Sequence, residues 1–338
     1  MAFLEFGSGS ASGFDEFSSR VGRLPPATFS DGTVALSDEA SILLFDRTGR
    51  FLRRVGRRGG GPGEFGGQGI DGLCVVRGDT LVAFSGTDRR VTAFRRDGKV
   101  LGTWPYPDSL RAGSTGCFRD GTAVFRSTSI AGLGTDHPVA AGFVGHFSGR
   151  HGTRPIGPLP MLSSLGGVRE AFVLPYTNGT TLTARASDFG FSVLPSRPGA
   201  AHLFRSPDQP LPYTSEDHAA FIRNSIPASA TGKQREMFEA AMRNQPSPKA
   251  WPAISSVRVD AASGAVWLRL YARDRLAQDW VVVSPASRRV VKVMMPDAAQ
   301  TGKWRLLAVN GTSLTVEWLD ADDIPHVGLF RVRPASGR

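Results

Sequence analysis

The chain has 338 residues, of which 41% are hydrophobic and 9% aromatic, so it can bury a substantial core and is not intrinsically disordered. The chain contains 40 lysine and arginine residues and 30 aspartate and glutamate residues, which gives a formal net charge of +10. This charge fits either binding of an anionic partner or a solubilising charge that is spread over a large surface. We expect no membrane span and see no signal peptide, because no apolar run approaches roughly 20 residues and the N-terminus lacks a basic segment followed by an apolar one.

The segment 24–56 shows the pattern from which we predict the fold. Four short apolar runs are separated by the turn signals Asp31-Gly32 and Thr48-Gly49, as in a four-stranded antiparallel meander. Comparable patterns recur at 70–105, 112–158, 171–206, 253–296 and 303–334. Repetition at about 40–45 residues is typical of a β-propeller. We therefore predict an all-β fold in which residues 1–338 form one six-bladed β-propeller of four-stranded antiparallel blades.

The last blade, at 303–334, offers one strand too few. Residues 2–6, which contain Phe3-Leu-Glu-Phe6, are the remaining unassigned strand-like run. We predict that this N-terminal strand closes the ring as the outer strand of the last blade. Closure of this kind removes an open edge that would otherwise invite aggregation.

The segment 210–252, between blades four and five, reads as helical rather than extended. Thr214 to Asp217 and Thr231 to Gln234 both resemble capping boxes at helix N-termini. We predict two short helices joined near Pro227.

The two cysteines are too few for a disulfide framework or a zinc site. Cys74 lies six positions before Thr80, and Cys117 lies five positions before Thr122, if these threonines are equivalent turn residues. Because side chains alternate along a strand, this difference points the cysteines to opposite faces of neighbouring inner strands. The prediction is two buried free thiols.

Three features carry a resemblance to a bacterial family of six-bladed, NHL-type β-propellers. They are the linker Arg57 to Phe65, the helical segment running into Pro252-Ala-Ile254, and the tryptophans of blade five at Trp267 and Trp280. The resemblance implies the propeller fold and implies no reaction. Members of the family are mostly exported or lipid-anchored proteins of undefined function, whereas this chain shows no exported N-terminus, so the compartment stays unknown.

One face of the predicted ring carries the unusual segments. In an antiparallel four-stranded blade, the turns between the second and third strands emerge on the same side as the links between blades. Arg57, Arg58, Arg89 and Arg90 then share a face, which suggests a polyanion site, although solvated strand edges explain the same pattern. The run Gly59 to Gly63 fits either a backbone nest for an anion or a structural linker.

The long loop 129–139 lies on the same predicted face and contains Asp136 and His137. A structural or solvent role is the favoured interpretation for all six histidines of the chain. His137 with Asp136 is the least ordinary case among them, so we include both as candidate binding residues.

No catalytic motif emerges from the sequence. It contains neither a Gly-x-Ser-x-Gly elbow nor a His/Cys spacing typical of metal ligands, so we predict no catalytic residue, metal or cofactor. The favoured function is a non-catalytic, monomeric binding propeller that engages a protein, peptide or glycan over one face of the ring. The enzyme question stays open, with a hydrolase or lyase acting at the channel mouth as the alternative. Nucleic-acid binding ranks lower, because basic motifs interleaved with aromatic residues are missing.

Overall fold

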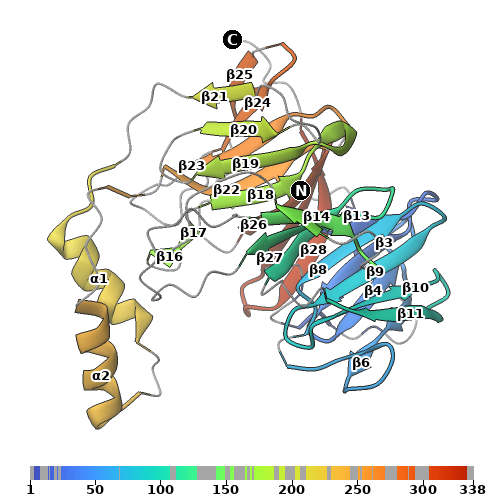
Figure 1. Ribbon diagram of the computed structural model, residues 1–338, viewed down its shortest axis with the longest axis horizontal. Coiled ribbons are helices and arrows are strands. Elements are labelled where there is room, and N and C mark those ends of the chain that lie inside the picture. The colour runs from blue at the N-terminus through green and yellow to red at the C-terminus, as the bar shows by residue number, and fades with distance from the viewer. Residues whose placement is uncertain are drawn as a thin grey trace.

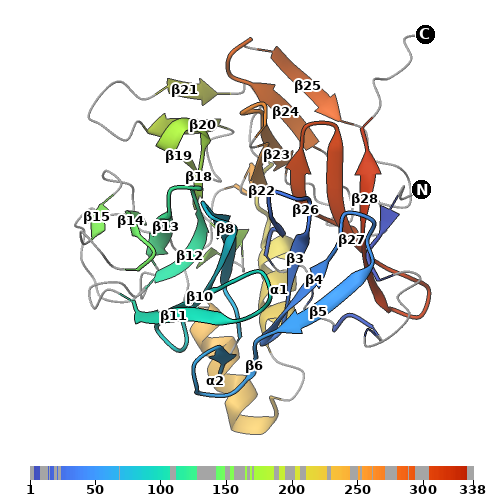
Figure 2. The same cartoon turned by 90° about the vertical axis from the view of Figure 1, so that its right-hand side faces the viewer.

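The computed structural model describes residues 4–7, 14, 16–18, 21, 24–67, 69–106, 112–127, 142–148, 153–155, 164–165, 168–169, 171–185, 190–194, 202–205, 211–226, 230–243, 250–251, 253–260, 262–270, 280–287, 289–293 and 304–332. Six antiparallel sheets of four strands each surround a common centre, as Figure 2 shows. The protein is therefore a six-bladed β-propeller, as the sequence predicts.

The first three blades follow one another along the chain, each running from its inner to its outer strand. Their strands are β2 (Ala27–Thr28), β3 (Val34–Asp38), β4 (Ser41–Phe45) and β5 (Phe51–Val55), then β8 (Gly72–Val76), β9 (Thr80–Ser85), β10 (Arg90–Phe94) and β11 (Val100–Pro105), then β12 (Ala112–Cys117), β13 (Thr122–Ser127), β14 (Gly142–His146) and β15 (Thr153–Pro155). A small parallel pair, β6 (Arg57–Arg58) with β7 (Glu64–Phe65), lies in the link between the first two blades.

The remaining blades continue the same order. Their strands are β18 (Ala171–Pro175), β19 (Thr181–Arg185), β20 (Gly190–Leu194) and β21 (His202–Arg205), then β22 (Ile254–Val259), β23 (Val266–Leu270), β24 (Trp280–Ser284) and β25 (Arg289–Val293), then β26 (Trp304–Asn310), β27 (Ser313–Leu319), β28 (Pro325–Arg331) and the N-terminal β1 (Leu4–Glu5). A two-stranded sheet of β16 (Ser164–Leu165) and β17 (Val168–Arg169) precedes blade four, and a short 3-10 helix (Thr177–Gly179) connects β18 to β19.

The core lies between the blades rather than within any one of them. All five residues of β4 are buried, because both faces of this middle strand are covered, and its sequence is accordingly a near-continuous apolar run. The outer strand β5 is instead mostly exposed and carries Arg53 and Arg54, charged side chains of the kind that protect sheet edges from pairing. Each apolar layer joins two blades, so the stability of the ring depends on how neighbouring blades stack.

The predicted closure of the ring is confirmed. Strand β1 pairs antiparallel with β28, with Leu4 opposite Leu329 and Glu5 opposite Gly328. The Phe6 amide then donates to the Val327 carbonyl at 2.9 Å. The Phe6 ring is 2% exposed and lies 5.4 Å from that of Phe45 in blade one, so the N-terminal segment joins the last blade to the first.

The helical insertion between blades four and five is also confirmed, as α1 (Ser215–Ser225) and α2 (Gly232–Arg243). Thr214 and Asp217 form the predicted capping box in both directions. The hairpin stands away from the sheets. In both views the hairpin and β6 lie at the lower side of the molecule, apart from each other in Figure 1 (Figures 1 and 2). Neither helix of the described chain is long and apolar enough to cross a membrane.

The two faces of the ring differ in construction. We call the face with the blade-to-blade links and the second-to-third strand turns the link face, and the opposite one the turn face. On the turn face, hydrogen bonds join adjacent blades at four junctions: Ser30 N to Asp79 Oδ1 (3.0 Å), Arg77 N to Arg119 O (2.6 Å), Tyr176 Oη to Gly264 O (2.6 Å) and Gly311 N to Asp260 Oδ1 (3.0 Å). These bonds hold the short turns in fixed positions.

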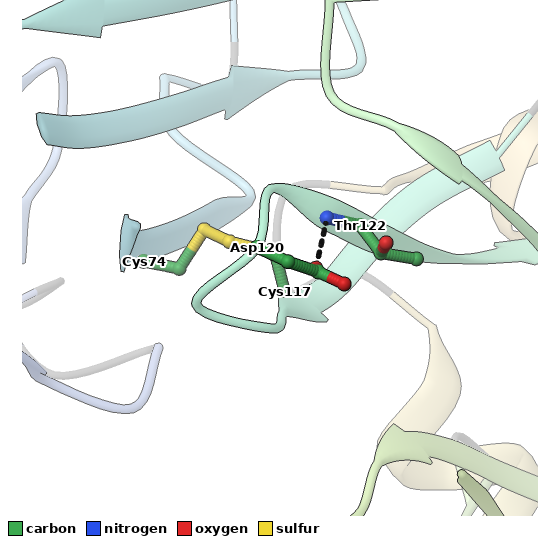
Figure 3. The surroundings of a disulfide bond; sticks show 4 residues. All are labelled: Cys74, Cys117, Asp120 and Thr122. Carbon is green, nitrogen blue, oxygen red and sulfur yellow. Dashed lines mark hydrogen bonds between the residues drawn. A yellow bond between two sulfur atoms is a disulfide. The ribbon is translucent and has the colours of Figure 1, made fainter. Parts of the chain in front are cut away.

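The prediction of two free thiols is wrong. Cys74 in β8 and Cys117 in β12 form a disulfide between blades two and three, with their Cα atoms 6.0 Å apart (Figure 3). The two side chains do lie on opposite faces of their own sheets, as the alternation predicts. In a ring, however, one face of each blade packs on the opposite face of the next, so opposite orientations bring equivalent inner strands together. Both cysteines accordingly belong to the apolar layer that contains Val82 and Ala123.

Candidate functional site

The link between blades one and two carries a small sheet of its own on the link face. Strand β6 runs parallel to β7, with Arg57 beside Glu64 and Arg58 beside Phe65. The side chain of Arg57 is 80% exposed and that of Arg58 is 64% exposed. The short parallel pair therefore presents two guanidinium groups to solvent, from backbone positions that are fixed by hydrogen bonds.

The glycine run forms the nest that the sequence suggests, and the protein's own Glu64 fills it. The Gly61 amide donates to Glu64 Oε2 at 2.9 Å, and Arg57 Nε donates to Oε1 at 2.8 Å. These hydrogen bonds, first from Gly61 and then from Arg57, hold the pKa of the Glu64 carboxyl below its ordinary value. The nest is thus competent to bind a carboxylate, and an internal one occupies it.

Glycine is required at position 59 for a geometric reason. A Cβ added to Gly59 would lie 2.1 Å from Glu64 Oε2, and its φ of +155° is rare for residues with side chains. The neighbouring Gly60 has open space around the same position, with nothing within 4 Å. The two glycines therefore differ in role, although the sequence does not distinguish them.

Arg90 secures this loop from blade two. Its Nη1 donates to the Gly60 carbonyl at 2.8 Å, and its Nη2 donates to the Glu64 carbonyl. Nη2 also lies 3.8 Å from Asp88, and the Arg90 side chain is only 17% exposed. These contacts engage the guanidinium in holding the link, so Arg90 positions the surface rather than forming its exposed part.

Arg89 occupies the exposed turn between β9 and β10. Its φ of +51° places the backbone in the left-handed region, and its carbonyl accepts a hydrogen bond from the Tyr106 amide at 2.7 Å. The structure therefore places Arg57 and Arg58 in the link and Arg89 and Arg90 in the turn beside it, with Arg90 in the supporting position. Asp136 and His137, the other two predicted binding residues, lie outside the described residues.

The arginine cluster is partly balanced by carboxylates. Arg58 Nη2 lies 3.4 Å from Glu39 Oε2 and Arg57 Nη2 lies 2.7 Å from Glu64 Oε1, but both pairs are highly exposed on the arginine side. Exposed pairs of this kind contribute little stability, about 0–1 kcal/mol, so the guanidinium groups can exchange to a partner's carboxylates or sulfates at small cost. The arrangement fits reversible contact with an acidic surface.

Three features of the structure were missed by the sequence reasoning. They are the disulfide, the carboxylate of Glu64 inside the nest, and the contacts of His326 with Glu5 and Asp320. A signal for Glu64 was present, because it lies three residues after Gly61 in the same loop. Within the described residues, no group of three or more histidine, cysteine, aspartate or glutamate side chains is arranged to hold a metal ion.

Comparisons with known proteins agree with the fold. No protein-family model matches the sequence, and no curated protein matches it either. A DUF4221 family member from Bacteroides vulgatus aligns over 99% of this chain and 98% of its own, with a TM-score of 0.57 at 10% identity. A candidate exported protein from Bacteroides fragilis aligns over 98% and 94%, with a TM-score of 0.55 at 12% identity. At these identities the likeness shows the propeller fold alone.

A virginiamycin B lyase from Staphylococcus aureus is a more distant structural neighbour. It aligns over 95% of this chain and 88% of its own at 10% identity, but the TM-score is 0.46. That likeness carries no argument about this chain.

Proposed function

We propose that this protein is a non-catalytic recognition propeller that binds an acidic protein segment, peptide or glycan over the link face. The observation that carries the proposal is the exposure of Arg57 and Arg58 on a hydrogen-bonded parallel pair, with exposed Arg89 in the adjacent turn. The underlying loop is held by Arg90 and by the Glu64 carboxylate. A fixed loop presents its cations without a large ordering cost on binding.

The asymmetry of the ring supports the choice of face. Hydrogen bonds between blades tie down the short turns of the turn face. The link face carries the longer connections and the projecting helical hairpin, and binding residues are disproportionately found on such loops over a rigid scaffold. The NHL-type assignment, the monomeric state and the broader polyanion site remain predictions.

The chain supplies a matched control for the test. Arg57→Gln with Arg58→Gln removes two charges from the link face, whereas Arg77→Gln with Arg119→Gln removes two exposed charges from the turn face. The probes are poly-L-glutamate for an acidic peptide, heparin for an acidic glycan and single-stranded RNA, each titrated at low and at physiological salt.

We expect poly-L-glutamate or heparin to bind, and the link-face variant to lose roughly 2- to 30-fold in affinity, on the scale of two exposed ion pairs. The turn-face variant should bind like the parent. Equal losses in the two variants would indicate non-specific charge attraction and would contradict the proposal. Binding of RNA alone would support the nucleic-acid alternative instead.

We also propose that the protein works in an oxidising compartment. Disulfides form and persist mainly in exported proteins, and the Cys74–Cys117 bond is built into the layer between two blades. The candidate exported protein from Bacteroides fragilis is consistent with this compartment. Thiol labelling of the denatured protein from its native host should find both cysteines blocked unless a reductant is added. Two labelled thiols without reductant would refute the assignment.

A further inference from the structure

His326 lies at the closure of the ring and faces a carboxylate at each of its ring nitrogens. Nδ1 is 2.6 Å from Glu5 Oε1, and Nε2 is 3.1 Å from Asp320 Oδ2. Glu5 belongs to β1, the strand that closes the ring, and Asp320 follows β27. One side chain therefore connects the N-terminal strand to a turn of the last blade, across 321 positions of sequence.

The surroundings fix the imidazole in place. Its ring stacks on Trp318 at 5.4 Å with an interplanar angle of 12°. Asp320 is itself positioned by the turn, because its Oδ1 accepts the amides of Asp322 and Ile324 at 2.9 Å each. The ring and one carboxylate thus form a fixed platform, and Glu5 approaches it from the closing strand.

Two ionised carboxylates accept hydrogen bonds and donate none, so only the doubly protonated imidazolium satisfies both contacts. A neutral imidazole donates through one nitrogen and turns a lone pair toward the other carboxylate. Partial burial lowers the pKa of His326, but the hydrogen bonds and charges of Asp320 and Glu5 outweigh it, and the pKa is raised above its ordinary 6.5. The stabilisation that both contacts give is therefore present below pH 6.5, and it is lost as the pH rises through the raised pKa of His326.

The other charged groups nearby do not change this balance. Asp322 and Asp323 lie in the same turn and are exposed, so solvent screens their charges. Glu317 is on the opposite face of β27, where it pairs with Arg305. From blade five, Trp280, Val282 and Val293 contribute apolar side chains to the layer around Trp318. Two cations of blade five also face blade six: Arg269 lies opposite Trp280, and Arg258 donates to the Leu306 carbonyl at 3.2 Å. The pKa of His326 is raised in the presence of both.

We propose that His326 is a pH-sensitive latch on the strand that closes the ring. In the cationic form it holds Glu5, and with it β1, against the Asp320 turn. Loss of the proton leaves one carboxylate facing a lone pair and releases that hold. Strand β1 is suited to such control because it is two residues long, whereas β28 pairs with β27 through seven residues.

Hydrogen exchange at the Phe6 amide tests the latch, because this amide donates to Val327 when the ring is closed. After correction for intrinsic exchange, protection of Phe6 should fall roughly tenfold from pH 6 to pH 9 in the parent, on the scale of one charge-assisted hydrogen bond. Glu5→Gln should lower the protection at pH 6 and flatten the profile. His146→Gln in blade three should leave the profile unchanged.

A second measurement keeps the outcome independent of folding defects in the variants. An NMR titration of the parent should give His326 a pKa above 6.5 that falls in Glu5→Gln. The latch would be overturned by a His326 that titrates at or below 6.5. It would also be overturned by Phe6 protection that follows the same profile in the parent and in Glu5→Gln.

Discussion

Breaking the bond between Cys74 and Cys117 should destabilise the ring by a predictable amount. The bond closes a chain segment with a sequence separation of 43 residues. In the chain-entropy model, a loop of this length restricts the unfolded chain by about 13 cal/mol/K, or about 4 kcal/mol at 25 °C. For a chain of 338 residues, the usual entropy of unfolding then converts this loss into a fall in Tm of about 5–6 °C.

Scanning calorimetry of the oxidised and reduced parent measures this effect without removing the sulfur atoms. Cys74→Ala with Cys117→Ala provides a second comparison, which should lose somewhat more because the sulfur atoms packed in the layer between the blades are also removed. A reduced protein that melts at the same temperature as the oxidised one would refute the reasoning. It would mean that stacking of blades two and three alone sets the unfolding of the ring.

Other predictions concern the closure and the link loop. Deleting residues 1–6 removes the buried Phe6 and the pairing of β1 with β28. The free energy of unfolding should therefore fall by about 3–6 kcal/mol, and light scattering should show aggregation through the opened edge. A stable monomer would argue against closure by β1. Gly59→Ala should displace the Glu64 carboxylate and raise hydrogen exchange across 57–65, whereas the control Gly60→Ala should not; equal exchange in both would contradict the nest. Because the pKa of Glu64 is lowered, its carboxylate should hold this loop fully ordered above pH 4.5, and the order should be lost as the pH falls through the lowered pKa. Hydrogen exchange across 57–65, measured at decreasing pH, follows this loss.

The architecture was predictable because it is encoded locally. Turn signals such as Asp31-Gly32 and runs of alternating or buried strand residues repeat along the chain, and a repeat count of six with one strand missing leads directly to closure by the N-terminus. The capping box at Thr214 and Asp217 is likewise a signal within four residues. Such features need no knowledge of which blades touch.

The contacts between distant segments were not predictable in the same way. Alternation gives the face of Cys74 and of Cys117, but their meeting depends on how one blade stacks on the next. The contact of His326 with Glu5 requires the register of β1 against β28, which short strands do not specify in sequence. The supporting role of Arg90, compared with the exposed Arg57, similarly depends on where the link folds back over blade two.

Hydrogen-exchange footprinting of the protein with the acidic probe bound tests the central claim most directly. If the link face is the recognition surface, poly-L-glutamate or heparin should protect residues 57–65 and 86–90 and leave the turn-face segments 77–79 and 119–121 unchanged. Protection confined to 77–79 and 119–121 would contradict the claim and place recognition on the turn face.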